Sequence, residues 1–202
     1  MISTYAAAIC MAFSLTVALT PFVRQLAFKI GAVDVPDNKR KTHAKPMPAL
    51  GGLAVAFGFL TTLWFTRLLF RNLELAPVWQ LALPGAAILL VGMVDDTFGI
   101  KPRYKLALQF LAALAFYWCG LRMEKVFGMN LPVWAALPAT LLWLVACANV
   151  VNLLDGMDGL AAGIGALVSG TLLALSAYVG QGEVAVLFGA FCGACLGFLL
   201  FN

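Results

Sequence analysis

Long apolar runs occupy most of this 202-residue sequence and constrain its fold more than any other feature. If a membrane-spanning helix needs roughly 17 to 25 mostly apolar residues, the sequence predicts about seven spans. Their expected bounds are Ser3–Val23, Ala49–Thr66, Val78–Val94, Leu106–Leu121, Pro132–Val151, Leu160–Val179 and Val184–Phe201. Hydrophobic residues make up 63% of the chain and charged residues 11%, and the mean hydropathy is +0.96. This composition excludes a soluble domain and predicts an all-α, polytopic transmembrane helix bundle that forms a single domain over residues 1–202.

The distribution of charge predicts how the chain crosses the membrane. Lys and Arg number 13 and Asp and Glu number 9, giving a net charge of +4. That charge is too small and too scattered to indicate a partner such as nucleic acid. The first cation is Arg24, so we expect a first helix that is not cleaved and has its amino end outside. In that orientation most cations, every Asp and the carboxyl terminus lie on the cytoplasmic side.

Residues 149–159, Asn-Val-Val-Asn-Leu-Leu-Asp-Gly-Met-Asp-Gly, close the fifth apolar run. Amide and carboxylate side chains recur there at every third position: Asn149, Asn152, Asp155 and Asp158. Side chains three residues apart lie beside one another on a helix. Gly156 and Gly159 disfavour a continuous helix, so we expect a break that exposes carboxylates and backbone together. An ordinary polar loop explains the segment less well, because uncompensated acids at membrane depth are costly and usually mark a functional site.

Two adjacent acids, Asp95 and Asp96, end the third apolar run. The helix dipole already presents partial negative charge there, so ionisation of both acids requires cations or a metal nearby. Lys101, Arg103 and Lys105 follow at alternate positions, and on an extended loop we expect all three to lie within reach of the aspartates. Carboxylates beside substrate phosphates suit Mg²⁺. The pattern predicts a metal site beside an anion-binding clamp; the alternative is that the acids only cap the turn into the fourth helix.

The loop before the second apolar run combines cations, the only histidine and a glycine pair. The basic residues within 39–45 could bind a phosphate headgroup or only fix the topology. His43 has no second His or Cys nearby, so the residues alone favour a solvated loop histidine. Gly51 and Gly52 predict close backbone packing or an unusual turn where the second helix begins.

Small residues mark the seventh apolar run. Gly189, Gly193 and Gly197 are spaced by four and predict a ridge for helix packing. Cys192 and Cys195 have the spacing of a redox motif, but inside a membrane helix we interpret them as small, soft packing residues.

Three of these motifs together resemble the polyprenyl-phosphate N-acetylhexosamine-1-phosphate transferases, multi-helix inner-membrane enzymes that move a sugar phosphate from a UDP-sugar onto a lipid phosphate. The motifs are Asp95-Asp96 with its basic tail, the segment from Asn149 to Asp158, and the His43 loop ending in Gly51-Gly52. The latter two are more similar to the undecaprenyl-phosphate N-acetylglucosaminyl-1-phosphate transferases, which start teichoic acid, O-antigen or other envelope polymers. The phospho-N-acetylmuramoyl-pentapeptide transferase branch is the alternative within the family.

The resemblance implies a multi-pass enzyme of the bacterial inner membrane with its active site facing the cytoplasm. Its implied partners are a UDP-N-acetylhexosamine, undecaprenyl phosphate and membrane lipid, and its implied cofactor is Mg²⁺ or Mn²⁺. The resemblance is also compatible with a homodimer. By the resemblance, Asp95 is the candidate base or lipid-phosphate contact and Asp96 its metal or phosphate partner. The implied catalytic residues are Asp95, Asp96, Asp155 and Asp158, the substrate-binding residues Asn152, Lys105, Arg103, Lys45 and His43, and the metal ligands Asp96, Asp155 and Asp158.

Two other functions stay open from the sequence. A secondary transporter or channel would also use broken helices and intramembrane carboxylates, but such sites favour the bilayer midplane and repeated halves, whereas these acids gather at one edge. A non-catalytic remnant that binds nucleotide or packs with a partner is the other. Family members normally continue past a segment like Leu199–Asn202 into a motif with a further metal-binding Asp. We therefore expect the chain to be a fragment or a truncated reading frame, with activity requiring the missing motif.

Overall fold

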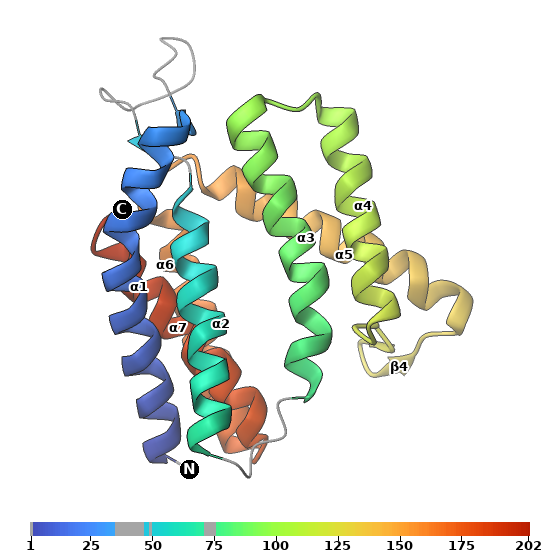
Figure 1. Ribbon diagram of the computed structural model, residues 1–202. Helices are drawn as coiled ribbons and strands as arrows, with labels where there is room; N and C mark the ends of the chain where they lie inside the picture. Colours follow the sequence, from blue (N-terminus) through green and yellow to red (C-terminus); the bar gives the residue numbers. More distant parts are fainter. Residues whose placement is uncertain (1, 35–46, 49, 71–75) are drawn as a thin grey trace. The chain divides into compact units, whose positions relative to one another are not determined.

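The computed structural model of the protein describes residues 2–34, 47–48, 50–70 and 76–202 (Figure 1). Helices dominate it, and the strands form two antiparallel pairs of two residues each. In chain order the elements are α1 (Ile2–Ile30), β1 (Val33–Asp34), β2 (Met47–Pro48), α2 (Gly51–Leu69), α3 (Ala76–Phe98), α4 (Pro102–Trp118), β3 (Lys125–Val126), β4 (Met129–Asn130), α5 (Val133–Leu154), α6 (Leu160–Tyr178) and α7 (Gly182–Leu199).

The predicted all-α fold is confirmed, and its apolar helices make the chain a polytopic membrane protein. Among the described residues, five helices are long and apolar enough to cross a membrane: α1, α2, α5, α6 and α7. Helices α3 and α4 also coincide with expected segments, but the count of seven spans and the orientation stay predictions. The fourth expected segment, Leu106–Leu121, lies mostly within α4, which begins four residues earlier at Pro102, because proline is favoured in the first turn of a helix.

The chain divides into two compact units, which are described separately. Unit 1 consists of Met1–Leu75 and Leu154–Asn202, and unit 2 of Ala76–Leu153. Unit 1 therefore contains α1, α2, α6 and α7, while unit 2 contains α3, α4, the β3–β4 pair and nearly all of α5. The expected single domain over residues 1–202 stays a prediction.

In unit 1, α7 packs against α1, α2 and α6 (Figure 1). A Cβ atom at Gly193 would collide with the backbone of Ile9, and one at Gly197 would lie 2.6 Å from the carbonyl oxygen of Phe13. Only glycine lets the two backbones approach so closely. The predicted packing role of the glycine ridge is thus confirmed.

The cysteines of α7 also serve packing. Both are free thiols. Cys192 Sγ donates a hydrogen bond of 3.5 Å to the carbonyl oxygen of Ala166 on α6, and Cys195 is buried.

Gly51 does open α2, and the ring of Phe198 fills the space that a side chain there would need. These contacts confirm close packing at Gly51, but a Cβ atom at Gly52 would meet nothing within 4 Å, so the prediction is not confirmed for Gly52.

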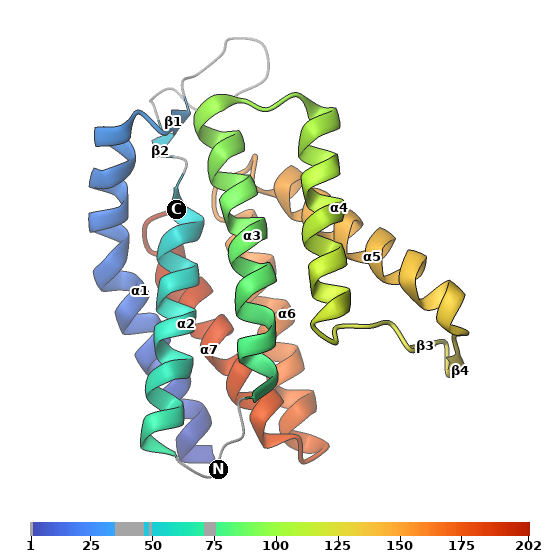
Figure 2. The same cartoon turned by 45° about the vertical axis from the view of Figure 1, so that its right-hand side comes forward.

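In unit 2, α3 and α4 run side by side and are joined by a short turn (Figure 2). After α4 the backbone N–H of Met123 donates a hydrogen bond of 2.9 Å to Thr140 Oγ1 on α5. Thr140 itself is buried and donates to the carbonyl oxygen of Ala136, 2.6 Å away. This threonine fastens the chain that follows α4 to the first half of α5.

Candidate functional site

The turn between α3 and α4 is built around Asp95. The backbone N–H of Gly99, a residue with a positive φ of 63°, donates to the carbonyl oxygen of Asp95 at 2.8 Å. The N–H of Ile100 donates to the side-chain Oδ1 of Asp95 at 3.2 Å. Asp95 therefore caps the carboxyl end of α3, as the simpler interpretation of the acid pair predicts, but this bond uses only one of its two carboxylate oxygens.

The second oxygen of Asp95 binds Lys105. Lys105 Nζ lies 2.5 Å from Asp95 Oδ2 and donates a further hydrogen bond of 3.0 Å to Asn152 Oδ1 on α5. The side chains of Lys105 and Asp95 are 17% and 19% exposed, so water screens the pair only partly. One lysine thus joins residues from α3, α4 and α5, and Asp95, Lys105 and Asn152 are called the lysine cluster below.

One helical turn further along α4, a second polar contact crosses to α5. Asn149 Nδ2 donates hydrogen bonds of 2.8 Å to Gln109 Oε1 and to the carbonyl oxygen of Val145. Gln109 did not emerge as a functional candidate from the sequence. The sequence feature that could have identified it is a single amide side chain in an apolar stretch of the helix. Gln109 follows Lys105 by four residues, so the two side chains lie on the same helical face.

The predicted basic clamp is only partly present. Lys105 reaches Asp95, but the guanidinium of Arg103 lies over the ring of Tyr104, 4.9 Å from its centroid, and the side chain of Arg103 is exposed. In the described residues neither Arg103 nor Lys101 forms an ion pair. The expectation of an extended loop is wrong, since α4 begins at Pro102, and residues two apart on a helix point to different sides.

The helix break expected at residues 155–159 is confirmed. Helix α5 ends at Leu154, the N–H of Met157 donates to the carbonyl oxygen of Leu154, and α6 begins at Leu160. Gly159 adopts the left-handed conformation with φ 69°. Burial raises the pKa of the Asp155 carboxyl above its ordinary value, although its side chain still reaches solvent. The break therefore presents a carboxylate that is partly stripped of water.

The predicted metal ligands come from both units. Asp96 belongs to unit 2, whereas Asp155 and Asp158 belong to unit 1, and all three side chains are exposed. Within the described part of the chain, no three His, Cys, Asp or Glu side chains gather closely enough to hold a metal ion. His43 and Lys45, expected to bind substrate, lie outside the described residues. The predicted metal set therefore stays a prediction.

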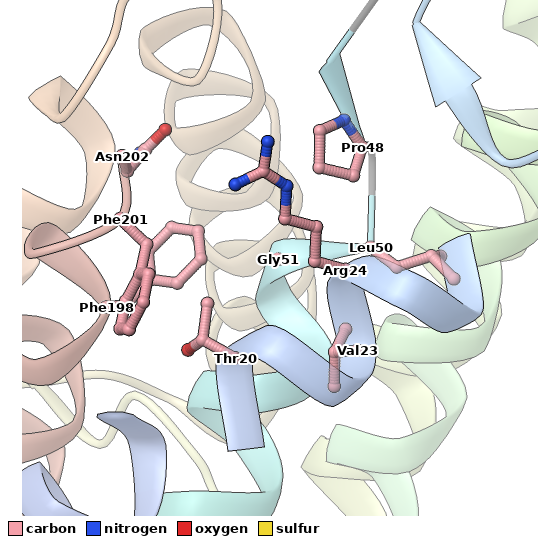
Figure 3. A pocket seen from close by; sticks show the side chains of 9 residues that line it. All are labelled: Thr20, Val23, Arg24, Pro48, Leu50, Gly51, Phe198, Phe201 and Asn202. Atoms are coloured by element: carbon pink, nitrogen blue, oxygen red, sulfur yellow. The ribbon is translucent and has the colours of Figure 1, made fainter. Parts of the chain in front are cut away.

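Unit 1 also contains a pocket of about 270 Å³ where α1 and α7 end and α2 begins (Figure 3). Its lining comprises Thr20, Val23, Arg24, Pro48, Leu50, Gly51, Phe198, Phe201 and Asn202. The rings of Phe198 and Phe201 lie together on one side, and the side chain of Arg24 extends between them and Pro48 (Figure 3). None of the residues predicted to bind substrate or metal lines this pocket.

Comparison with known proteins gives a consistent result. Residues 78–202 match the family model described as glycosyl transferase family 4. A probable undecaprenyl-phosphate N-acetylglucosaminyl 1-phosphate transferase of Bacillus subtilis is 32% identical over 192 residues, which cover 91% of this chain and 51% of that protein. A phospho-N-acetylmuramoyl-pentapeptide-transferase of Caldicellulosiruptor bescii is 33% identical over 202 residues, covering 90% of this chain and 60% of that protein.

A third relative is the decaprenyl-phosphate N-acetylglucosaminephosphotransferase of Mycolicibacterium smegmatis. It is 31% identical over 208 residues, which cover 93% of this chain and 51% of that protein. The chain thus spans between about half and three fifths of the length of these three relatives. Both the lysine cluster and the break at residues 155–159 fall within the part that the family model matches.

Proposed function

Because the chain belongs to glycosyl transferase family 4, we propose that it transfers N-acetylhexosamine-1-phosphate from a UDP-sugar to undecaprenyl phosphate and releases UMP. GlcNAc-1-phosphate is the proposed group, and the product begins a cell-envelope polysaccharide. The observation that carries the proposal is the lysine cluster, in which Lys105 bonds to both Asp95 and Asn152. Since the chain spans only part of its relatives, this activity belongs to the complete protein.

The proposed chemistry needs little beyond positioning and charge neutralisation. An oxygen of the lipid phosphate attacks the phosphorus that carries the sugar, a new P–O bond forms, and the bond to the bridging oxygen breaks as UMP leaves. Lys105 Nζ has three N–H groups, and the cluster uses two of them. The third can meet a phosphate oxygen and offset the negative charge that develops during transfer.

Asp95 is better suited to hold Lys105 than to remove a proton. Its two oxygens bind the N–H of Ile100 and the ammonium of Lys105, and a phosphate monoester, with its second pKa about 6, is already mostly ionised at neutral pH. We therefore assign Asp95 the orientation of Lys105, with direct contact to the lipid phosphate as a further role.

Mg²⁺, or Mn²⁺ in its place, fits the chemistry of the remaining acids. Asp155 and Asp158 are exposed carboxylates in a break flanked by glycine, and hard oxygen ligands of this kind suit Mg²⁺. Asp96, Asp155 and Asp158 would hold the ion, which would neutralise the diphosphate of the donor. Asn152, Arg103, Lys45 and His43 complete the proposed substrate-binding set, on the cytoplasmic side of the bacterial inner membrane. A homodimer is also compatible with this assignment.

Transfer of phospho-N-acetylmuramoyl-pentapeptide is the second candidate. It is favoured by the 33% identity to the transferase of that name from Caldicellulosiruptor bescii. The two activities share their chemistry and differ in the sugar nucleotide that acts as donor.

Membranes containing the complete protein distinguish these functions. We expect them to release UMP from UDP-N-acetylglucosamine and to form a lipid-linked sugar diphosphate, only when undecaprenyl phosphate and Mg²⁺ are both present. Turnover with UDP-N-acetylmuramoyl-pentapeptide alone would select the second candidate. Uptake of a solute without any lipid-linked product would contradict both and favour a transporter, and nucleotide binding without turnover would indicate a non-catalytic remnant.

A further inference from the structure

Gln109 is a buried residue with an amide side chain, at a position where helix packing alone does not require a polar group. It is 4% exposed on α4, and the residues next to it in the chain, Leu108 and Phe110, are apolar. A polar group buried in such surroundings is costly unless it is hydrogen-bonded. Within the described part of the chain, its side chain is hydrogen-bonded to a single partner, Asn149 on α5.

The geometry fixes how the two amides face each other. The carbonyl oxygen of Val145 can only accept a hydrogen bond, so the group of Asn149 that faces it is Nδ2. The other hydrogen of Nδ2 then points to Gln109, which must present Oε1. Gln109 therefore acts as an acceptor that holds the Asn149 amide in one orientation.

This contact and the lysine cluster form two parallel links between α4 and α5. Lys105 and Gln109 are four residues apart on α4, and Asn152 and Asn149 are three apart on α5. Lys105 bonds to Asn152 and Gln109 to Asn149. Two links set both the rotation and the height of the last turn of α5, whereas one link would leave it free to turn about a single bond.

We propose that Gln109 is a positioning residue for phosphoryl transfer: its bond to Asn149 fixes the last turn of α5 and so keeps Asn152 against Lys105. This assignment rests on the proposed function, but it goes further, because it gives a catalytic effect to a residue that need not touch substrate. A displacement of about 1 Å at a reacting group can lower a rate about 100-fold.

The test compares Gln109→Met with Thr140→Val in the complete protein. Methionine keeps the length of the side chain and removes the acceptor. Thr140 is the matched control, because it is also buried in unit 2 and hydrogen-bonded to two groups, but its bonds serve the other half of α5. For Gln109→Met we expect kcat for UMP release to fall about 10- to 100-fold, with the KM for UDP-N-acetylglucosamine within about threefold of wild type.

A purely structural role would lower the amount of folded enzyme and leave kcat per folded molecule unchanged, as we expect for Thr140→Val. That result for Gln109→Met would overturn the proposal. The double variant Gln109→Met with Asn149→Leu should be no slower than Asn149→Leu alone, because the two residues act as a unit. If the losses in kcat of the two single variants multiply in the double variant, Gln109 and Asn149 act independently, and the proposed pairing is wrong.

Hydrogen exchange measured on the same variants does not depend on turnover. In Gln109→Met the amides of residues 149–154 should exchange about threefold faster than in wild type, and in Thr140→Val they should not, since local opening follows the loss of the bond that holds the segment. Unchanged exchange in Gln109→Met would overturn the positioning role. If wild type releases no UMP, the proposed function fails while the exchange result still decides this inference.

Discussion

The two units differ in what connects their helices. In unit 1, hydroxyl groups bond back to their own helix: Thr20 to the carbonyl oxygen of Thr16, Thr66 to that of Thr62, and Ser169 to that of Gly165. In unit 2, Lys105 and Asn149 bond to side chains on other helices. Hydroxyl groups of unit 2, those of Thr97 and Thr140, also bond back to their own helix. The contrast therefore lies between the close backbone approach at the glycines of unit 1 and the long polar side chains of unit 2.

The free energies of the two kinds of contact show what this difference means for stability. Hydrogen bonds between membrane helices average only about 0.6 kcal/mol, so the links in unit 2 add little to stability. Close packing at glycine depends on many contacts and leaves no room for adjustment. If the proposed function is correct, the polar links of unit 2 exchange partners when a phosphate binds. The difference locates the adjustable part of the protein around Lys105.

The largest effect that the comparison predicts comes from filling the glycine ridge of unit 1. Gly193→Ala would push a Cβ atom into the backbone of Ile9, and overpacking against a backbone that cannot move should cost about 3 kcal/mol. We expect little folded protein in membranes and a sharply lower Tm in detergent.

Gly170→Ala is the matched control for this substitution. A Cβ atom there would meet Cys192 Sγ at 3.7 Å, an ordinary contact, so its yield and Tm should stay near wild type. Equal losses in both variants would show that the close approach of α1 and α7 is not what holds unit 1 together.

Removing the central cation of unit 2 should have the next largest effect. Lys105→Met deletes the partner that Asp95 and Asn152 share, and loss of one such charge-stabilising donor typically costs about 100- to 1,000-fold in kcat. Folding should be retained, because the links contribute little to stability. Lys29→Met, at the exposed end of α1, should leave UMP release unchanged. A folded Lys105→Met enzyme with near-normal kcat would contradict the assignment.

The sequence predicts some of these features well and others poorly, for physical reasons. Hydrophobic run length locates the seven helices of the described residues, and the glycines at 156 and 159 locate the break before α6, because both signals are local. The partners of Asp95 are not local: alternation in sequence suggested three cations, whereas the helical start at Pro102 brings Lys105 to Asp95 and places Arg103 over Tyr104. Gln109 was missed because its meaning depends on Asn149, forty residues away.

Substitution of Arg103 should have a smaller effect, and it tests whether the predicted basic clamp forms. Arg103 is exposed and stacks on Tyr104, so Arg103→Gln should raise the KM for the UDP-sugar by about 3- to 10-fold and leave kcat almost unchanged, as expected for uniform binding. Steady-state kinetics of UMP release measures both. A fall in kcat as large as that of Lys105→Met would mean that the predicted basic clamp forms when substrate binds.

The smallest effect concerns the stability contributed by Asp155. Burial raises its pKa above the ordinary 3.8, so the folded state binds this proton more tightly than the unfolded chain does. The contribution of Asp155 to stability is therefore full below the ordinary pKa and is lost as the pH rises through the folded pKa. At neutral pH the charged carboxylate of Asp155 slightly lowers the free energy of unfolding, and contact with solvent keeps this effect small.

Asp155→Asn should consequently raise Tm slightly at pH 7 and flatten the dependence of Tm on pH in the acid range, while abolishing turnover. Thermal unfolding followed at several pH values tests this. A lower Tm at pH 7 would show that the charged form is stabilised by a partner in the folded protein.

The most direct test of the lysine cluster is the rate of UMP release by membranes containing the complete protein with Asp95→Asn. The amide keeps the shape of Asp95 and an acceptor oxygen for the turn, but it removes the charge that holds Lys105. We predict normal abundance of the protein and a rate lower by about 1,000-fold, comparable to loss of Lys105 itself. A rate equal to wild type from the same amount of protein would contradict the claim that this cluster carries the chemistry.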